Sequence, residues 1–472
     1  MSREQETAAE QAAAPALSPS ADGRARWRAE ARDLFILGAP MALTQLVQFS
    51  INTIDVLMIG RLGAAPLAAS SLGLVVFFTA WQVGYGPAMA VSPMVSQAIG
   101  ANRHDYDDVR RSVRMGLWAV ALLFPAILIF FASAGQLALF LGQPPELAKM
   151  AAPYVLALAP GWMFFMGTLV LRNFLAAIGL TRAPLYMIIG VTAFNFVLNY
   201  LLIFGTFGFP RLELVGAGIA SSIANLLGFL ALAAYCRWQP DARAFDIFKD
   251  VLQPDWPRLR EIAQLGWPIA ITTAFEGMLF NSCVLLMGRI GVEEMAAYQV
   301  ALNLAALAFM GPLGVSMAGA VRVGLHMGAG DMAAVRRAAL LSILMCVAMM
   351  AVAASIVLTA PMAIATLYLQ TADPDNLVVV GLVGSFLRIA AAFMLFDGVQ
   401  VAANQALRGL KDVRLPMIIT GVSYWAVGFP TAAYLGLASP MGATGVWVGL
   451  LVSLGVAAAL LSVRLYLRTR RG

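Results

Sequence analysis

The chain has 472 residues, of which 61% are hydrophobic and 12% are charged, and its mean hydropathy is +0.81. Soluble domains carry about 25% charged residues, so this composition excludes a soluble protein. The net charge of +6 does not indicate nucleic-acid binding, because the basic residues follow a topological pattern and form no patch. Apolar stretches long enough to cross a bilayer, about 20 residues each, predict about twelve membrane-spanning helices. The sequence lacks the alternating segments of a transmembrane β-barrel.

The start of the chain is rich in Ala, Glu and Ser, and we expect residues 1–32 to form a disordered cytoplasmic tail. This segment lacks the basic start and apolar core of a signal peptide. Most Lys and Arg residues fall at the two ends of the chain and in alternate predicted loops. By the positive-inside rule, this pattern predicts a multi-pass protein of a bacterial-type inner membrane with both termini in the cytoplasm.

The first apolar segment, Leu37–Gly63, carries a stripe of polar residues on one helical face. The stripe follows the spacing i, i+3, i+7 and i+10 and consists of Gln45, Gln48, Asn52 and Asp55. An ionised carboxylate at the bilayer centre costs at least about 2.5 kcal/mol, so Asp55 is expected to line a cavity and handle a cation or a proton. The alternative is a structural role, since intramembrane amides also join neighbouring helices.

Further along the chain, Asn195 and Asn199 share a helical face by their i, i+4 spacing. The charged segment 241–258 then interrupts the apolar stretches and predicts a cytoplasmic linker. It divides the chain into an N-lobe, residues 33–240, and a C-lobe, residues 259–472, each expected to contain six helices.

The second half repeats the first. Leu37–Gly63 aligns without a gap onto Leu265–Gly291, and further on Gly86 falls on Gly314. An even number of helices in each half makes the two repeats parallel. Two such pseudo-symmetric lobes are typical of transporters that work by alternating access.

The second half contributes two further intramembrane acids, Glu276 and Asp397. We expect all three acids to bind substrate or the coupling cation, with a sodium site possible at Glu276 and Asp397. The supporting amides share helical faces in two sets, Gln299 with Asn303 and Asp397 with Gln400 and Asn404. Arg388 is the one clearly intramembrane base, and its spacing from Asp397 points it away from that acid.

The sequence offers no positive case for an enzyme. It contains no Ser/His/Asp set, no phosphate-binding loop and no metal-ligand cluster, and its two histidines, His104 and His326, fall at predicted helix ends. We therefore expect no cofactor.

Several motifs, in order along the chain, resemble those of the multidrug and toxic compound extrusion (MATE) transporters, in particular the NorM-like branch. The motifs are Ile54-Asp55 with Met58-Ile59-Gly60-Arg61-Leu62-Gly63, Ser92-Pro93 with Gln97, Asn195 with Leu198-Asn199-Tyr200, Phe275-Glu276, Ala297-Tyr298-Gln299-Val300-Ala301, Phe396-Asp397-Gly398-Val399-Gln400 and Leu407-Arg408-Gly409. The resemblance runs from about Asp33 to the end of the chain.

This resemblance implies an all-α, twelve-helix, V-shaped antiporter. Such a protein exports cationic lipophilic compounds in exchange for protons or sodium, and a monomer within membrane lipid suffices. Asp55 is similar to the acid of the family's first helix, with Asn195 and Asn199 as its neighbours. Glu276 and Asp397 match the acids of the C-lobe cavity that are implicated in cation coupling. The chain departs from the family at Tyr298, where many relatives have histidine.

The main alternative is a flippase for a lipid-linked sugar or a related amphiphile. An anionic headgroup requires several Arg or Lys residues in the cavity, and the sequence indicates only Arg388 at membrane depth. The buried acids therefore favour cation export over the flippase.

Overall fold

The computed structural model describes residues 23–102, 106–361, 363 and 374–470, with side chains in the last range from residue 378 onward. All regular secondary structure in these ranges is helical, as the composition predicts. His104 lies outside the described residues.

The first half of the chain forms one helical bundle. Its helices are α2 (Gly23–Gly60), α3 (Ala64–Ala101), α4 (Tyr106–Ala132), α6 (Pro145–Ala177), α7 (Arg182–Phe204) and α8 (Glu213–Trp238), with the short helices α5 (Ala134–Phe140) and α9 (Pro240–Arg243) in the connections. The second half forms the other bundle, from α10 (Trp256–Ile290), α11 (Val292–Gly328), α12 (Met332–Thr359), α14 (Pro374–Gly409), α15 (Arg414–Gly421), the π-helix η1 (Val422–Gly428), α16 (Phe429–Leu437) and α17 (Ala443–Arg470).

Eleven helices in the described ranges are long and apolar enough to cross a membrane. The consecutive elements α15, η1 and α16 form a further helical stretch, residues 414–437, which the π-helix interrupts. Counting this stretch with the eleven gives the twelve helices predicted from the apolar segments. Such π-turns inside helices often occur at functional sites.

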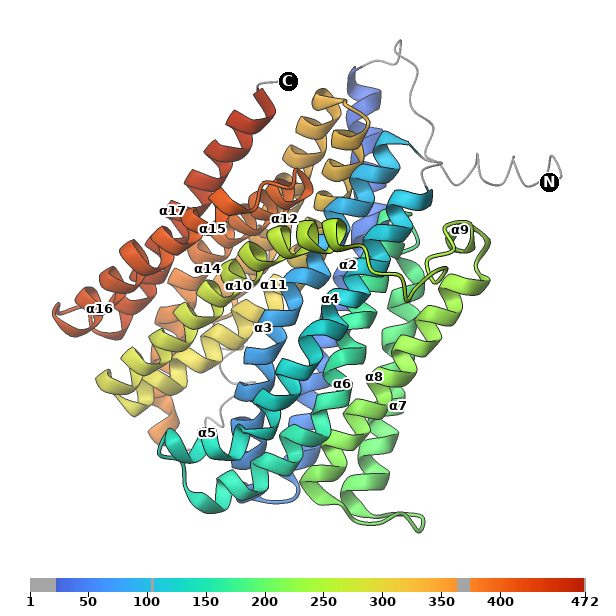
Figure 1. Cartoon of the computed structure of the whole chain (residues 1–472). Coiled ribbons are helices and arrows are strands. Elements are labelled where there is room, and N and C mark those ends of the chain that lie inside the picture. The colour runs from blue at the N-terminus through green and yellow to red at the C-terminus, as the bar shows by residue number, and fades with distance from the viewer. Residues whose placement is uncertain (1–22, 103–105, 362, 364–373, 471–472) are drawn as a thin grey trace.

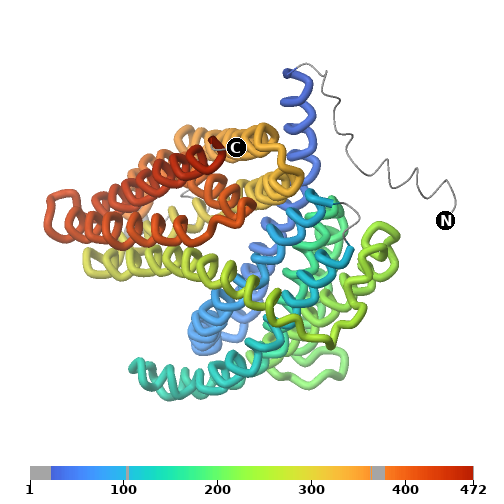
Figure 2. Tube along the Cα trace, turned by 45° about the horizontal axis from the view of Figure 1, so that its top comes forward, coloured from blue at the N-terminus to red at the C-terminus, as the bar shows by residue number. Residues whose placement is uncertain are grey.

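The two bundles form a V. Figure 1 shows the blue-to-green bundle and the yellow-to-red bundle side by side at the end where α2 begins and α17 ends, and the bundles diverge toward the opposite end. The turned view in Figure 2 shows the same divergence. We call the joined end, with Gly23 and Arg470, the closed end.

Close backbone contacts between the bundles lie toward the closed end. A Cβ atom on Gly86 of α3 would collide with the carbonyl oxygen of Gly266 of α10, and one on Gly314 of α11 would collide with the backbone of Ala42 of α2. Gly86 and Gly314 are the glycines that the sequence repeat aligns. The repeat therefore appears in the packing, where the second long helix of each bundle contacts the first long helix of the other.

A charged cluster also joins the bundles at the closed end. Glu30 of α2 is buried, and its two carboxylate oxygens accept hydrogen bonds from Arg322 of α11 at 2.8 and 2.6 Å. The Nε2 atom of His326 lies 2.9 Å from the same carboxylate, and Asp33 lies 3.2 Å from Arg322. This finding corrects the prediction of a disordered tail through residue 32, because α2 begins at Gly23 and the pairing with Arg322 holds its first turns against α11.

The segment predicted as a linker, residues 241–258, contains most of α9, the stretch between the two helices and the first turn of α10. It runs across the surface of α4. The carbonyl oxygens of Phe245 and Val251 accept hydrogen bonds from Arg110 and Trp118 of α4, at 3.1 and 2.7 Å. These contacts anchor the connection to the first bundle. The lobe boundaries at 33–240 and 259–472 stay predictions.

Candidate functional site

The acid of the first bundle, Asp55 of α2, is half-buried and bound by an asparagine pair. The Nδ2 atom of Asn199 donates to Asp55 Oδ1 at 2.6 Å, and it also lies 3.1 Å from the Oδ1 atom of Asn195. Asn195 in turn contacts Ser221 of α8 at 3.4 Å. Asn195 and Asn199 of α7 are both buried. The structure thus brings together the three residues that the sequence placed on two separate helical faces.

The rest of the stripe on α2 has a different partner. Gln48 and Gln45 accept hydrogen bonds from the guanidinium of Arg172 of α6, at 2.9 and 3.0 Å. Asn52 is exposed. The predicted face therefore exists, but Gln45 and Gln48 bind Arg172, whereas Asp55 binds Asn199.

The acids of the second bundle, Glu276 of α10 and Asp397 of α14, lie near enough to interact electrostatically. Asp397 is 6% exposed, and in the described part of the chain its Oδ1 atom has no hydrogen-bond partner. One turn along α14, Gln400 donates to the hydroxyl of Tyr424 in the π-helix η1 at 2.9 Å, and Asn404 is also buried. The predicted face of Asp397, Gln400 and Asn404 therefore points into the bundle.

Comparison with known proteins identifies the family. The MatE family model matches residues 40–201 and 268–434, one match in each half. The chain belongs to the MATE family. The MATE resemblance is thereby confirmed, and this MATE protein is a multi-pass membrane transporter and not an enzyme. The curated relatives described next confirm the NorM-like branch.

Curated relatives cover almost the whole chain. A probable multidrug resistance protein NorM of Rhizobium meliloti is 42% identical over 94% of this chain and 95% of its own length. A protein of the same description from Mesorhizobium japonicum is 37% identical over 94% of this chain and 95% of its own length.

Solved structures share the fold. The outward-facing conformation of a multidrug resistance MATE family transporter has a TM-score of 0.84 at 20% identity, covering 96% of this chain and 99% of that one. A eukaryotic MATE transporter has a TM-score of 0.83 at 21% identity, covering 94% and 98%. The predicted V-shaped, twelve-helix architecture is confirmed.

Three further polar residues around the predicted site lie on α11. Gln299 and Asn303 are exposed on α11. Tyr298, at the position where the sequence departs from many relatives, is fully buried against Trp447, with ring centroids 5.4 Å apart, and its hydroxyl donates to the carbonyl oxygen of Phe280 at 3.3 Å. Tyr298 therefore packs inside the second bundle.

Two basic residues inside the bundles, the half-buried Arg172 and the buried Arg408, had no role in the predicted site. Arg172 lies in α6, and Arg408, 8% exposed, lies in the last turn of α14 and interacts electrostatically with Glu276. Arg172 and Arg408 fall near helix ends, where the sequence pattern assigns basic residues to loops. The prediction that Arg388 is the one clear intramembrane base stays a prediction. Arg388 is exposed and donates to Ser385 at 3.3 Å.

The described residues contain no group of three or more His, Cys, Asp or Glu side chains that could hold a metal ion. The oxygen atoms at Asp397, Glu276, Gln400 and Tyr424 are still suited to a single exchangeable cation, because carboxylate and other oxygen ligands are those that hard cations prefer. A proton requires only one of the carboxylates.

Proposed function

We propose that this MATE protein is a secondary antiporter that exports cationic lipophilic compounds in exchange for protons or sodium. The observation that carries the proposal is Asp397, a carboxyl group that is 6% exposed and has one oxygen without a hydrogen-bond partner among the described residues. Its charged neighbour Glu276 has the same sign. Two carboxyl groups in such a place favour a proton or a bound cation over two free negative charges.

The exchange follows if drug and coupling cation compete for these carboxyl groups. Protons or sodium arriving from outside then displace the cationic drug outward. A tenfold proton gradient supplies about 1.4 kcal/mol per proton. Each net charge that moves across the membrane adds about 2.3 kcal/mol per 100 mV.

Alternating access of the two bundles completes the mechanism. The contacts at Gly86 with Gly266 and at Gly314 with Ala42 support an outward-facing state that is sealed at the closed end. The opposite state requires these contacts and the Glu30–Arg322 pair to separate. The names of the curated relatives, multidrug resistance proteins, support a broad range of substrates.

We also propose that the protein acts as a monomer in the lipid of a bacterial-type inner membrane, with the closed end toward the cytoplasm. The support is the concentration of basic residues at that end, such as Arg464 and Arg468 in α17. Reaction of single cysteines at positions 24 and 470 with an impermeant maleimide in inside-out vesicles, but not in intact cells, tests the orientation.

The experiment for the proposed function is efflux of a fluorescent lipophilic cation from proteoliposomes. A proton gradient and a sodium gradient are imposed separately, on the wild type and on Asp397→Asn. Efflux driven by one gradient and lost in the variant supports the antiporter and identifies its ion. Wild-type protein that responds to neither gradient contradicts it.

A flippase for a lipid-linked sugar is a second candidate function. Arg172 and Arg408 are the observation that counts in its favour. The sequence argued against an anionic substrate because it indicated only one arginine at membrane depth. These two guanidinium groups inside the bundles weaken that argument. They lie nearer the closed end than Asp55 and Asp397, however, so the acids face the opening of the V. Transfer of a fluorescent lipid-linked sugar across the bilayer, without any gradient-driven cation efflux, would favour the flippase.

A further inference from the structure

Arg172 of the first bundle and Arg408 of the second line neighbouring pockets, which share Met41, Asn173 and Met317. Gln45, a partner of Arg172, precedes Asp55 by ten residues on α2, and Arg408 follows Asp397 by eleven residues on α14. Gln48, the other partner of Arg172, precedes Asp55 by seven residues. At a rise of 1.5 Å per residue, each arginine lies roughly 10 to 16 Å from its acid along the helix axis, toward the closed end. We call Arg172 and Arg408 the arginine layer.

Neutral groups bind both arginines. Arg172 donates to the amide oxygens of Gln48 and Gln45, and Arg408 donates to Gln405 at 3.4 Å. Neither arginine forms a salt bridge within 4.0 Å in the described ranges. The hydroxyl group of Tyr85, on α3, lies within electrostatic range of both guanidinium groups and of Glu276. Among the described residues no carboxylate pairs directly with the layer, although Glu276 interacts electrostatically with Arg408.

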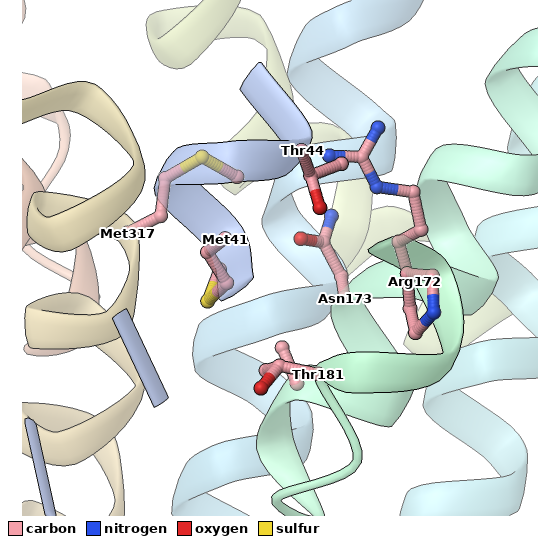
Figure 3. A pocket seen from close by; sticks show the side chains of 8 residues that line it. Met41, Thr44, Arg172, Asn173, Thr181 and Met317 are labelled. Atoms are coloured by element: carbon pink, nitrogen blue, oxygen red, sulfur yellow. The ribbon is translucent and has the colours of Figure 1, made fainter. Parts of the chain in front are cut away.

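Two small pockets lie at this layer. The pocket in Figure 3, about 20 Å³, is lined by Arg172 and Thr44, with Met41 and Met317 on its other side. A second pocket of about 10 Å³ is lined by Arg408 and Gln405. Asn173 lines both, so the two pockets are neighbours. A cavity needs a volume of about 10–15 Å³ to hold a water molecule. Each pocket is therefore about the size of a single water.

Each pocket is lined mostly by apolar surface, but its polar side chains, such as Arg172 with Thr44 and Arg408 with Gln405, could bind a water. Neighbouring waters are a hazard for an antiporter, because protons can pass along hydrogen-bonded waters. A fixed arginine charge is a known barrier of pores to protons and other cations. We propose that the arginine layer is an electrostatic barrier that keeps protons and sodium at the acids from reaching the closed end without exchange for substrate. This inference rests on the proposed cation coupling and adds specific roles for Arg172 and Arg408 in preventing an uncoupled leak.

Two isosteric variants test the barrier while keeping both arginines. Gln48→Glu and Gln405→Glu each place a carboxylate on the amide that already accepts from an arginine, so the local positive charge is cancelled and the hydrogen bond is retained. Proton entry into proteoliposomes is followed with an internal pH-sensitive dye, without substrate, under an imposed gradient. We expect each variant to raise the leak about tenfold, because it cancels one of the two positive charges that line the pockets.

The matched control is Gln264→Glu, which adds the same charge at an exposed position of α10. Its leak should equal that of the wild type. The arginine variants Arg172→Lys and Arg408→Lys keep the positive charge and should also remain tight. Because the two glutamate variants lie in different bundles, either one that folds is sufficient for the test.

A leak that stays at the wild-type level in the folded glutamate variants overturns the barrier. The same holds if Gln264→Glu leaks as much as they do. Substrate efflux by the wild type, measured in the same vesicles, reports separately on the antiporter. A failure of coupling there would contradict the proposed function, whereas the leak comparison still decides whether the arginine layer excludes protons.

Discussion

Two buried carboxylates, Glu30 at the closed end and Asp397 inside the second bundle, differ in their partners. The two residues are almost equally buried, with 5% and 6% of their surface exposed. Glu30 accepts two hydrogen bonds from Arg322 and lies 2.9 Å from His326, whereas Asp397 has an oxygen without a partner among the described residues and an acid as its charged neighbour. The comparison teaches that equally buried acids can differ in counter-charge. At Glu30 the counter-charge joins the bundles, and under the proposed function its lack leaves Asp397 available to an exchangeable cation.

Asp55 lies between these two cases. Its carboxylate accepts a hydrogen bond from the neutral amide of Asn199, which offers a donor but no positive charge. Variants of these acids test whether an acid matters more for transport when it has less counter-charge, beginning with the largest expected effect.

Asp397→Asn should reduce gradient-driven efflux to less than about a tenth of the wild-type rate, because the amide keeps the shape of the side chain but cannot ionise. The measurement is the initial rate in proteoliposomes, normalised to the amount of folded protein. A wild-type rate in this variant would remove Asp397 from the mechanism.

Glu276→Gln should act in the same direction as Asp397→Asn. Since the two carboxyl groups interact, the double variant should be no slower than Asp397→Asn alone, as expected for residues that act as a unit. Rates of the single and double variants in one vesicle preparation check this. Losses that multiply would indicate two independent sites.

Asp55→Asn should cause a partial loss, about two- to fivefold, because the new side chain still offers an oxygen to Asn199. The matched variant Asn199→Leu keeps the acid but removes its donor, and it should affect transport by a similar factor. Efflux rates of both variants are compared with those of Asp397→Asn. Complete loss in Asp55→Asn would place both bundles equally in the coupling.

Glu30→Gln should affect stability and not cation binding. It leaves Arg322 with only Asp33, 3.2 Å away, as a carboxylate partner. The cost should therefore stay below about 3–5 kcal/mol, the range that is typical when a buried pair is broken outright. We expect a lower thermal unfolding midpoint in detergent, partly restored by Arg322→Met in the same chain. The dissociation constant for tetraphenylphosphonium should stay within about twofold of the wild type, since the acids of the bundles are unchanged. A large loss of affinity would mean that Glu30 also handles cations.

Asp255→Asn should have the smallest effect. Asp255 caps α10 and accepts a hydrogen bond from Arg111 at 2.5 Å, and this bond lowers the pKa of the carboxyl group. A lowered pKa in the folded state adds stability above the unfolded value, about 3.9, which is lost as the pH falls through the folded pKa. The wild type should therefore unfold at a higher temperature than the variant at pH 7, and the difference should shrink at pH 3. A constant difference would exclude the charge as its cause.

The sequence revealed the acids because a carboxylate within an apolar stretch stands out against its neighbours. Helical periodicity also placed Asn195 beside Asn199 and Gln400 beside Asp397, since those relations are local. The contact of Asp55 with Asn199 joins two helices and depends on packing that no local pattern contains.

The buried bases were less visible. Arg408 is followed directly by Gly409, the last residue of α14, so its position resembles that of a loop residue. Glu30 and Arg322 pair across the two bundles, and nothing near either residue in the sequence indicates its partner. His326 was predicted only to fall at a helix end, and the structure places it beside Glu30.

The most direct test of the central claim is competition between drug and coupling cation in the purified protein. Tetraphenylphosphonium binding is measured by titration calorimetry at several pH values and sodium concentrations, with the wild type and Asp397→Asn. The wild type should lose affinity as protons or sodium increase, and the variant should show no such dependence. An equal dependence in both proteins would contradict the role of Asp397 as the residue at which drug and cation exchange.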